Sequence, residues 1–234
     1  MMYHTTANFY PAHTPKNGYI GRADITVADA IKMRGIAVFQ KEDGSLNLRF
    51  PTFGNKENTM IYPASKQAYA DMLQVVTDAV NDPQYHFGHA NGRYNPKLEV
   101  SGRLVDEPYA DARFTIDVEN FCTLRGVATR VADLKQTDGT FVAVDMPVLH
   151  KYENKEGETV YPTAFEGLKW HYKDKNQNEH TKDFGLLIRN LVKNERTKLM
   201  DRKPELGQTM TGASERSGQG AAKAAQERVP EPVR

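Results

Sequence analysis

Residues 31–38 read Ile-Lys-Met-Arg-Gly-Ile-Ala-Val, and residues 122–129 read Cys-Thr-Leu-Arg-Gly-Val-Ala-Thr. Each stretch has an apolar residue, then Arg-Gly, then a β-branched residue and Ala, so Arg34-Gly35 corresponds to Arg125-Gly126. Internal similarity is sought before single motifs, because a missed repeat leads to the wrong architecture. The two stretches predict two copies of one structural unit.

Three further landmarks follow each stretch in the same order. Residues 43–46 (Asp-Gly-Ser-Leu) match residues 138–141 (Asp-Gly-Thr-Phe), and each leads into a strand-like run that ends at a proline. A polar loop follows each proline, and it closes on an apolar-Tyr-Pro-small sequence. The prolines are Pro51 and Pro147, and the closing sequences are residues 61–64 and 160–163. Four landmarks in one order, offset by 91 to 99 residues, predict an internal duplication.

The local patterns predict that each unit is a small antiparallel sheet followed by a helix. Apolar residues alternate with polar ones from residue 25 to residue 50 and again from residue 98 to residue 141, which is typical of half-buried strands. The Asp-Gly pairs favour tight turns. In the first copy Ser65 caps a helix with one apolar face, which ends at Asp82-Pro83. In the second copy a polar and aromatic insertion precedes the helix, whose apolar face runs from Phe184 to Val192.

The composition is that of an ordinary soluble protein, with 39% hydrophobic residues, 26% charged residues and a net charge of +1. No apolar run approaches the ~18 residues of a membrane helix, and the polar start lacks the apolar core of a secretion signal. We therefore expect a cytoplasmic protein that does not contact membranes. Cys122 has apolar neighbours, so we expect a buried thiol rather than a reactive one.

These patterns divide the chain into five segments and predict an α+β fold. We expect an N-terminal arm (1–17), a first unit (18–82), a linker (83–96), a second unit with an insertion before its helix (97–203) and a disordered tail (204–234). The tail is rich in Gly, Gln, Ser, Ala and Glu and lacks apolar periodicity.

The second copy resembles the SpoVG family. Its residues 124–127 (Leu-Arg-Gly-Val), 138–139 (Asp-Gly), 146–148 (Met-Pro-Val), 157–158 (Gly-Glu) and 161–162 (Tyr-Pro) follow that family's series in order, and the first copy shows the series more faintly. The resemblance implies a sheet-plus-helix domain that dimerises and binds DNA or RNA, often as a bacterial regulator, without catalysis. Two tandem copies then imply an intramolecular pseudo-dimer that is monomeric in solution, in a regulatory or mobile-element setting.

The resemblance also implies where nucleic acid would bind. The family's basic loop corresponds to residues 54–58 and 149–157, which supply Lys56, His150, Lys151 and Lys155. Thr159 and Val160 stand where the family often has an arginine, so a protein-interaction module that inhibits or bridges another protein is the alternative. Independently of the family, residues 182–203 hold seven Lys or Arg against three acids. Their basic ridge consists of Arg189, Lys193, Arg196 and Lys198.

Other chemistry finds little support in the sequence. His86 and His89 have an H-x-x-H spacing, but structural zinc generally needs four ligands, so we expect no metal and no cofactor. We find no Gly-x-Ser-x-Gly or Walker-type motif, and we expect no enzymatic activity. Tyr152, Trp170, His171 and Tyr172 are candidates for base stacking, although large aromatic side chains are more commonly buried.

Overall fold

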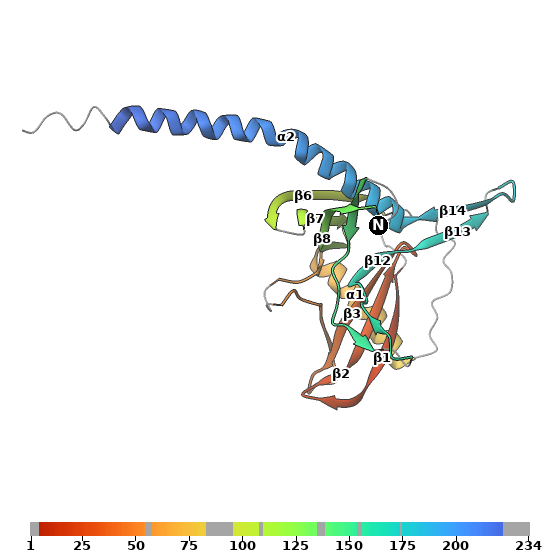
Figure 1. Ribbon diagram of the computed structural model, residues 1–234. Helices are drawn as coiled ribbons and strands as arrows, with labels where there is room; N and C mark the ends of the chain where they lie inside the picture. Colours follow the sequence, from red (N-terminus) through yellow and green to blue (C-terminus); the bar gives the residue numbers. More distant parts are fainter. Residues whose placement is uncertain are drawn as a thin grey trace, which may run out of the picture.

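The computed structural model describes residues 5–54, 58–82, 96–107, 110–134, 139–153, 156–173 and 175–221. These residues form an α+β fold with two five-stranded antiparallel sheets, two small hairpins and two helices (Figure 1). Among these residues no helix is long and apolar enough to cross a membrane.

The first sheet has the strand order β1-β2-β3-β12, and β4 pairs with the C-terminal half of β3, residues 37–40. Its strands alternate as the sequence predicts: Ile25 and Val27 on β2 are fully buried, whereas Arg22 is exposed. Lys41, Gly44 and Ser45 form the expected turn between β3 and β4. The strands are β1 (Thr5–Lys16), β2 (Tyr19–Val27), β3 (Ile31–Gln40), β4 (Leu46–Arg49) and β12 (Phe165–Gly167).

The second sheet has the order β6-β7-β8-β5, and β9 pairs with the C-terminal half of β8, residues 128–133. On β7, Phe114, Ile116 and Val118 are buried, and the polar residues between them point to the other face. The strands are β5 (Ile61–Pro63), β6 (Leu98–Glu107), β7 (Ala110–Val118), β8 (Cys122–Asp133) and β9 (Thr140–Asp145).

Two short strands cross between the sheets. β5 follows β4 in the chain but pairs with β8, where Ile61 lies opposite Leu124. β12 follows the strands β6 to β9 and a small hairpin in the chain but pairs with β3, where Phe165 lies opposite Met33. The flanking hydrogen bonds match as well, because the Arg125 amide donates to the Met60 carbonyl (2.8 Å) and the Arg34 amide donates to the Ala164 carbonyl (2.7 Å). Each sheet therefore contains one strand from the other half of the chain.

Each helix packs mainly on the sheet of its own half. α1 (Lys66–Asn81) packs on β1 and β4, and α2 (Phe184–Ala221) packs on β6 and β9 of the second sheet and also on β12 of the first sheet. The predicted cap of α1 is present: the Ala68 amide donates to Ser65 Oγ (3.0 Å). At the start of α2 the Leu186 amide donates to Asp183 Oδ1 (2.8 Å), and this hydrogen bond lowers the pKa of Asp183. The far part of α2 projects away from the sheets (Figure 1).

One hydrophobic core joins the two halves. Cys122 Sγ on β8 lies 3.8 Å from Met33 Sδ on β3. The predicted burial of Cys122 is confirmed, because its exposed fraction is 1%. Phe165 and Ile61 on the exchanged strands are fully buried in the same core. Burial of this apolar surface supplies most of the stabilisation of both sheets.

The fourth sequence landmark was matched wrongly. Residues 61–64 and 160–163 do not occupy equivalent places. β5 pairs with β8, and the strand that pairs with β3 in the same way is Phe165–Gly167. The hydrogen bonds show that Pro162 instead corresponds to Asn58. The Leu149 amide donates to the Pro162 carbonyl, as the Phe53 amide donates to the Asn58 carbonyl. The loop after Pro147 is longer than the loop after Pro51, so a similar tetrapeptide falls at a different point of each.

Several predicted segments differ from the observed elements. The N-terminal arm contains edge strand β1, so the first unit begins before residue 18. The insertion of the second unit contains β12 and a projecting hairpin, and α2 continues past residue 203 to Ala221. Residues 83–95 of the linker, with His86 and His89, and residues 222–234 of the tail lie outside the described residues. The hairpins are β10 (Tyr152–Glu153) with β11 (Thr159–Val160) and β13 (Lys169–Lys173) with β14 (Glu179–Asp183).

Candidate functional site

The face of the second sheet that points away from α2 carries a concentration of arginines. Side chains on a strand alternate between the two faces, and α2 and the core occupy one face of this sheet. Arg103 on β6, Arg113 on β7 and Arg125 on β8 fall at outward positions between buried or partly buried residues. We call this surface, together with Tyr62 and Phe53, the arginine face.

The strand register brings the three arginines close together. Arg103 lies directly opposite Arg113, and Arg125 lies opposite Thr115, two residues further along β7. Like charges on directly opposed residues of a sheet destabilise it. A phosphate bound between Arg103 and Arg113 would meet two guanidinium groups at once, which makes the pair chemically suited to phosphate.

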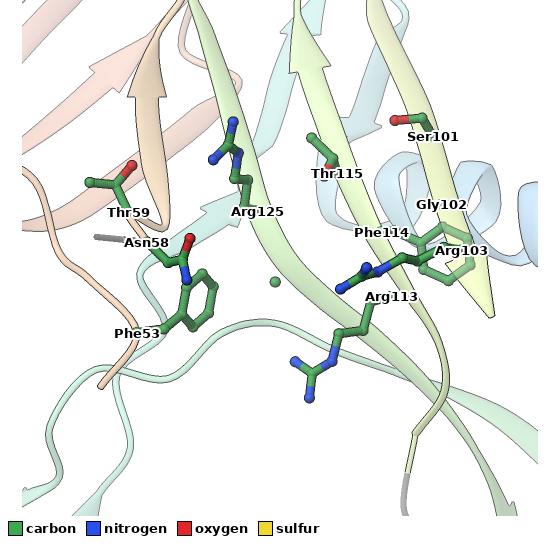
Figure 2. A pocket seen from close by; sticks show the side chains of 11 residues that line it. Phe53, Asn58, Thr59, Ser101, Gly102, Arg103, Arg113, Phe114, Thr115 and Arg125 are labelled. Atoms are coloured by element: carbon green, nitrogen blue, oxygen red, sulfur yellow. The ribbon is translucent and has the colours of Figure 1, made fainter. Parts of the chain in front are cut away.

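The arginines open on a hollow of about 530 Å³. This volume is in the range of small-ligand sites, about 300–1,000 Å³, so it exceeds what a single ion needs. Figure 2 shows Phe53 across the hollow from Arg103 and Arg113, with Asn58 and Thr59 beside it. The hollow therefore combines cationic, polar and aromatic groups.

A glycine bulge explains why Phe53 reaches the sheet. Gly126 has a φ of +88°, and the pairing of β7 with β8 shifts register at this point, between Phe114 and Thr115. A methyl group on Gly126 would collide with the Phe53 ring. Glycine accepts this backbone conformation at little cost and leaves room for the ring. The bulge thus seats Phe53 at the wall of the hollow.

Tyr62 adds a second aromatic group beside Arg125. The guanidinium carbon of Arg125 lies 5.6 Å from the centroid of the Tyr62 ring, within the distance of a cation–π contact. The Tyr62 side chain is 55% exposed although it lies on a strand of the core sheet. An exposed ring next to an exposed guanidinium is a surface on which a nucleobase stacks while the arginine binds a phosphate.

Two acidic residues of the same sheet, Glu99 and Asp117, lie at its other end. Glu99 is opposite Asp117, four residues along the strands from Arg103 and Arg113. At about 3.3 Å per residue this separation is about 13 Å, which exceeds the Debye length of about 8 Å at physiological salt. Lys97 Nζ lies 2.6 Å from Glu99 Oε1, and Thr123 donates to Asp117 Oδ1 (2.6 Å). These two carboxylates are therefore screened from Arg103 and Arg113.

None of the predicted site residues that the structure describes lines the hollow. Arg189 and Lys193 are exposed one helical turn apart on α2, whereas Lys198 pairs with Glu195 at 3.1 Å and Arg196 is half-buried. α2 packs on the opposite face of the second sheet from the arginine face. The Arg189–Lys198 ridge is thus separated from the hollow by the sheet itself.

The predicted basic loop is only partly described. His150 and Lys151 are exposed and follow Leu149, which covers Gly35 of the first sheet. Lys56 and Lys155 lie outside the described residues. Tyr152 is exposed and His171 accepts or donates a hydrogen bond with Thr181 (2.9 Å), whereas the side chains of Trp170 and Tyr172 lie outside the described part.

Sequence reasoning missed Arg103 and Arg113, and it used Arg125 only as a repeat landmark. Their signal was the outward position of each arginine in an alternating strand, which requires the register of three strands to be combined. The part of the chain that the structure describes contains no group of three or more His, Cys, Asp or Glu arranged to hold a metal. Comparisons of this chain with protein-family models, curated proteins and solved structures found no match.

Proposed function

We propose that this chain is a single-chain pseudo-dimer of two SpoVG-like units that binds single-stranded nucleic acid on the arginine face. It acts without catalysis, as a regulator of bacterial or mobile-element origin, and it is a monomer. The observation that carries the proposal is the meeting of Arg103, Arg113 and Arg125 at one hollow with two aromatic side chains beside it.

The chemistry of the face favours nucleic acid over other anions. A guanidinium presents two parallel N–H donors that match phosphate oxygens, and three of them on adjacent strands suit a chain of phosphates. Exposed aromatic rings on a sheet stack on unpaired bases, which is how sheet-based modules bind single strands. Bases in a duplex are already stacked, so Tyr62 favours a single strand. This preference distinguishes the arginine face from the α2 ridge, which has cations alone.

The pseudo-dimer proposal rests on the strand pairing. β5 and β12 cross in opposite directions, and the residue before each strand accepts a matching hydrogen bond, from the Arg125 amide and the Arg34 amide respectively. Two copies of a unit that exchange one strand each have the arrangement of a strand-exchanged dimer, here joined into one chain. Sedimentation is expected to give a monomer, and a stable dimer would contradict this part of the proposal.

The test is fluorescence anisotropy with labelled single-stranded and double-stranded DNA and RNA, titrated at several salt concentrations. We expect tighter binding of single strands, with log affinity falling by about 0.7 per phosphate contact against log salt. The R103A/R125A variant is expected to bind at least tenfold more weakly, because each lost hydrogen bond to a charged group is worth about 1.5–3 kcal/mol.

R49A is the matched control for R125A. Arg49 lies 4.6 Å from the centroid of the Phe39 ring on the first sheet, so R49A removes the same charge and the same type of ring contact elsewhere. Equal loss of affinity in R49A and R125A would mean that overall charge, and not the arginine face, governs binding. No binding at low salt would reject the proposal and favour the alternative, a protein partner, which a pull-down after nuclease treatment would then detect.

A further inference from the structure

The first sheet has an outward face built to the same register as the arginine face. Glu166 on β12 lies opposite Lys32 of β3, as Tyr62 on β5 lies opposite Thr123 of β8. Since Phe165 pairs with Met33 as Ile61 pairs with Leu124, Glu166 occupies beside Arg34 the place that Tyr62 occupies beside Arg125. The two faces can therefore be compared residue by residue.

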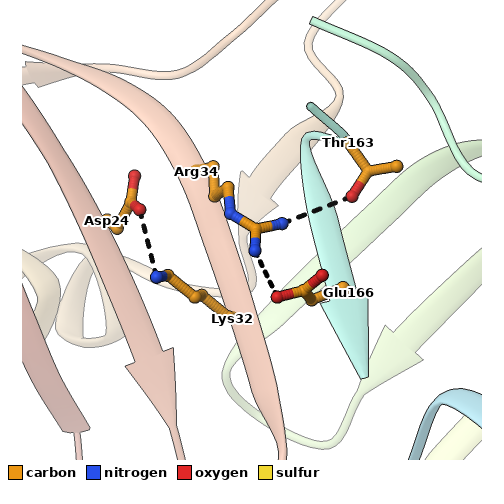
Figure 3. Close-up of polar contacts among 5 residues, drawn as sticks. All are labelled: Asp24, Lys32, Arg34, Thr163 and Glu166. Carbon is orange, nitrogen blue, oxygen red and sulfur yellow. Dashed lines mark hydrogen bonds and ion pairs between the residues drawn. The ribbon is translucent and has the colours of Figure 1, made fainter. Parts of the chain in front are cut away.

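At that matching place on the first sheet, Arg34 is held in an ion pair. Arg34 donates to the Glu166 carboxylate and, at 3.4 Å, to the Thr163 hydroxyl (Figure 3). On the second sheet, the described residues place no carboxylate within ion-pair distance of Arg125, which instead lies over the exposed Tyr62 ring. A guanidinium paired with a carboxylate has its charge offset and keeps fewer donors with which it could bind phosphate.

A second carboxylate acts in the same way on the neighbouring strand. Asp24 on β2 lies at the bulge, where the register shifts between Ala23 and Ile25, and it matches Thr115 of β7. Lys32 Nζ lies 3.4 Å from Asp24 Oδ2 (Figure 3). The position opposite Arg22 is Tyr10, whereas the position opposite Arg113 is Arg103. The first-sheet face therefore has carboxylates where the arginine face has Thr115 and Tyr62.

We propose that the chain binds one nucleic-acid strand and not two, because Glu166 and Asp24 close the face of the first sheet that matches the arginine face. This inference rests on the proposed function and names the residues that set its stoichiometry. Removing both carboxylates frees Arg34 and Lys32 beside the exposed Arg22, so that three cations again lie on adjacent strands. The closed face then becomes a second site for the same ligand.

The experiment transfers the binding function from one sheet to the other. The ligand is a fluorescent deoxythymidine oligonucleotide of about eight nucleotides, within the site size of about 4–16 nucleotides of single-strand binders. R103A/R125A is expected to lose binding, and adding D24T and E166Y, which copy Thr115 and Tyr62, is expected to restore it to within about tenfold of the wild type. In the wild-type background D24T/E166Y is expected to raise the stoichiometry from one strand per chain to two.

The control is E42Q/E153Q, which removes two exposed carboxylates at other places and changes the net charge equally. Restoration by E42Q/E153Q in the R103A/R125A background would overturn the inference, as would two strands bound by the wild type. Failure of D24T/E166Y to restore binding in a folded protein would also overturn it. Should that variant not fold, D24N/E166Q gives the same test with side chains of unchanged shape. A wild type that does not bind at all rejects the proposed function itself, so the two failures are distinguishable.

Discussion

Cys122 Sγ on the second sheet lies 3.8 Å from Met33 Sδ on the first sheet. The contact lies beside both exchanged strands, because Cys122 pairs with Pro63 of β5 and Met33 pairs with Phe165 of β12. The two sheets thus share one continuous core at the point where their chains cross. Stability, reactivity and binding are all expected to depend on this arrangement.

Both halves are expected to unfold together. Phe165 is fully buried, and F165A is expected to lower the free energy of unfolding by about 3–5 kcal/mol, the usual cost of deleting a buried aromatic ring. Urea unfolding followed by far-UV and near-UV circular dichroism is expected to give one coincident transition. F141A is the control, since Phe141 is 46% exposed, and it should change little. Two separate transitions would show that the sheets are independent domains.

The Cys122 thiol is expected to be unreactive in the folded protein. Burial raises its pKa above the ordinary value of 9.0, and the thiolate is the reactive form. A thiol-specific chromogenic reagent is expected to label Cys122 in guanidinium chloride and to leave it unlabelled in buffer. Rapid labelling of native protein would contradict the shared core.

The same pKa shift predicts a dependence of stability on pH. Because the pKa is raised in the folded state, the unfolded chain loses its thiol proton first as the pH rises. The Cys122 contribution to the free energy of unfolding is therefore intact below about pH 9 and is lost progressively above it. Denaturant unfolding of the wild type and C122A between pH 8 and about pH 10.5 checks this, and the wild type is expected to lose more stability than C122A.

The bulge glycine predicts a measurable steric cost. G126A places a methyl group against Phe53 and strains a backbone with φ of +88°, whereas G44A has φ of +83° and meets no atom within 4 Å. G44A is expected to cost about 1–2 kcal/mol of strain alone, and G126A to cost more. F53A in the G126A background should recover the difference. Equal destabilisation by the two single variants would mean that Phe53 does not pack over Gly126.

The Tyr62 ring is expected to supply stacking and not hydrogen bonding. Y62A is expected to weaken binding of single strands by about 1–3 kcal/mol, the value of one stacked base, whereas Y62F retains the ring and should bind as the wild type does. Anisotropy titrations of both variants check this. A loss in Y62F equal to that in Y62A would assign the role to the hydroxyl group.

The ridge on α2 is expected to contribute less than the arginine face. R189E/K193E reverses two exposed charges on the far side of the second sheet, so it should weaken binding only through long-range repulsion and lose its effect at high salt. K41E/K66E reverses two exposed lysines elsewhere and serves as its control. Loss of binding in R189E/K193E that persists at high salt would instead place the nucleic acid on α2.

The sequence allowed the regular elements to be predicted, because each has a local cause. Alternation of apolar residues marked β2 and β7, the Ser65 hydroxyl marked the start of α1, and apolar neighbours marked the burial of Cys122. The strand exchange could not be predicted. β5 and β12 have three residues each, too few for a period to appear, and their partners are distant in the chain.

The candidate site was missed for a related reason. Arg103, Arg113 and Arg125 meet only when the registers of three strands are known, and each appears alone in the sequence as an ordinary exposed cation. The clustered cations near residue 190 were easier to see, since one helix turn brings them together. The Tyr-Pro landmark misled because sequence similarity there did not follow hydrogen bonding.

The crossing of β5 and β12 also sets the order in which this protein can be completed during translation. Arg34 and Glu166 are 132 residues apart, and at about 5–20 residues per second the ribosome needs roughly 7 to 26 seconds to make the chain between them. Until β12 is made, residues 31–33 of β3 have an unpaired edge, which is a template for pairing with other nascent chains. The first sheet therefore cannot be completed until the second half of the chain has been made. Translation rate and chaperone supply are expected to govern the yield of folded protein.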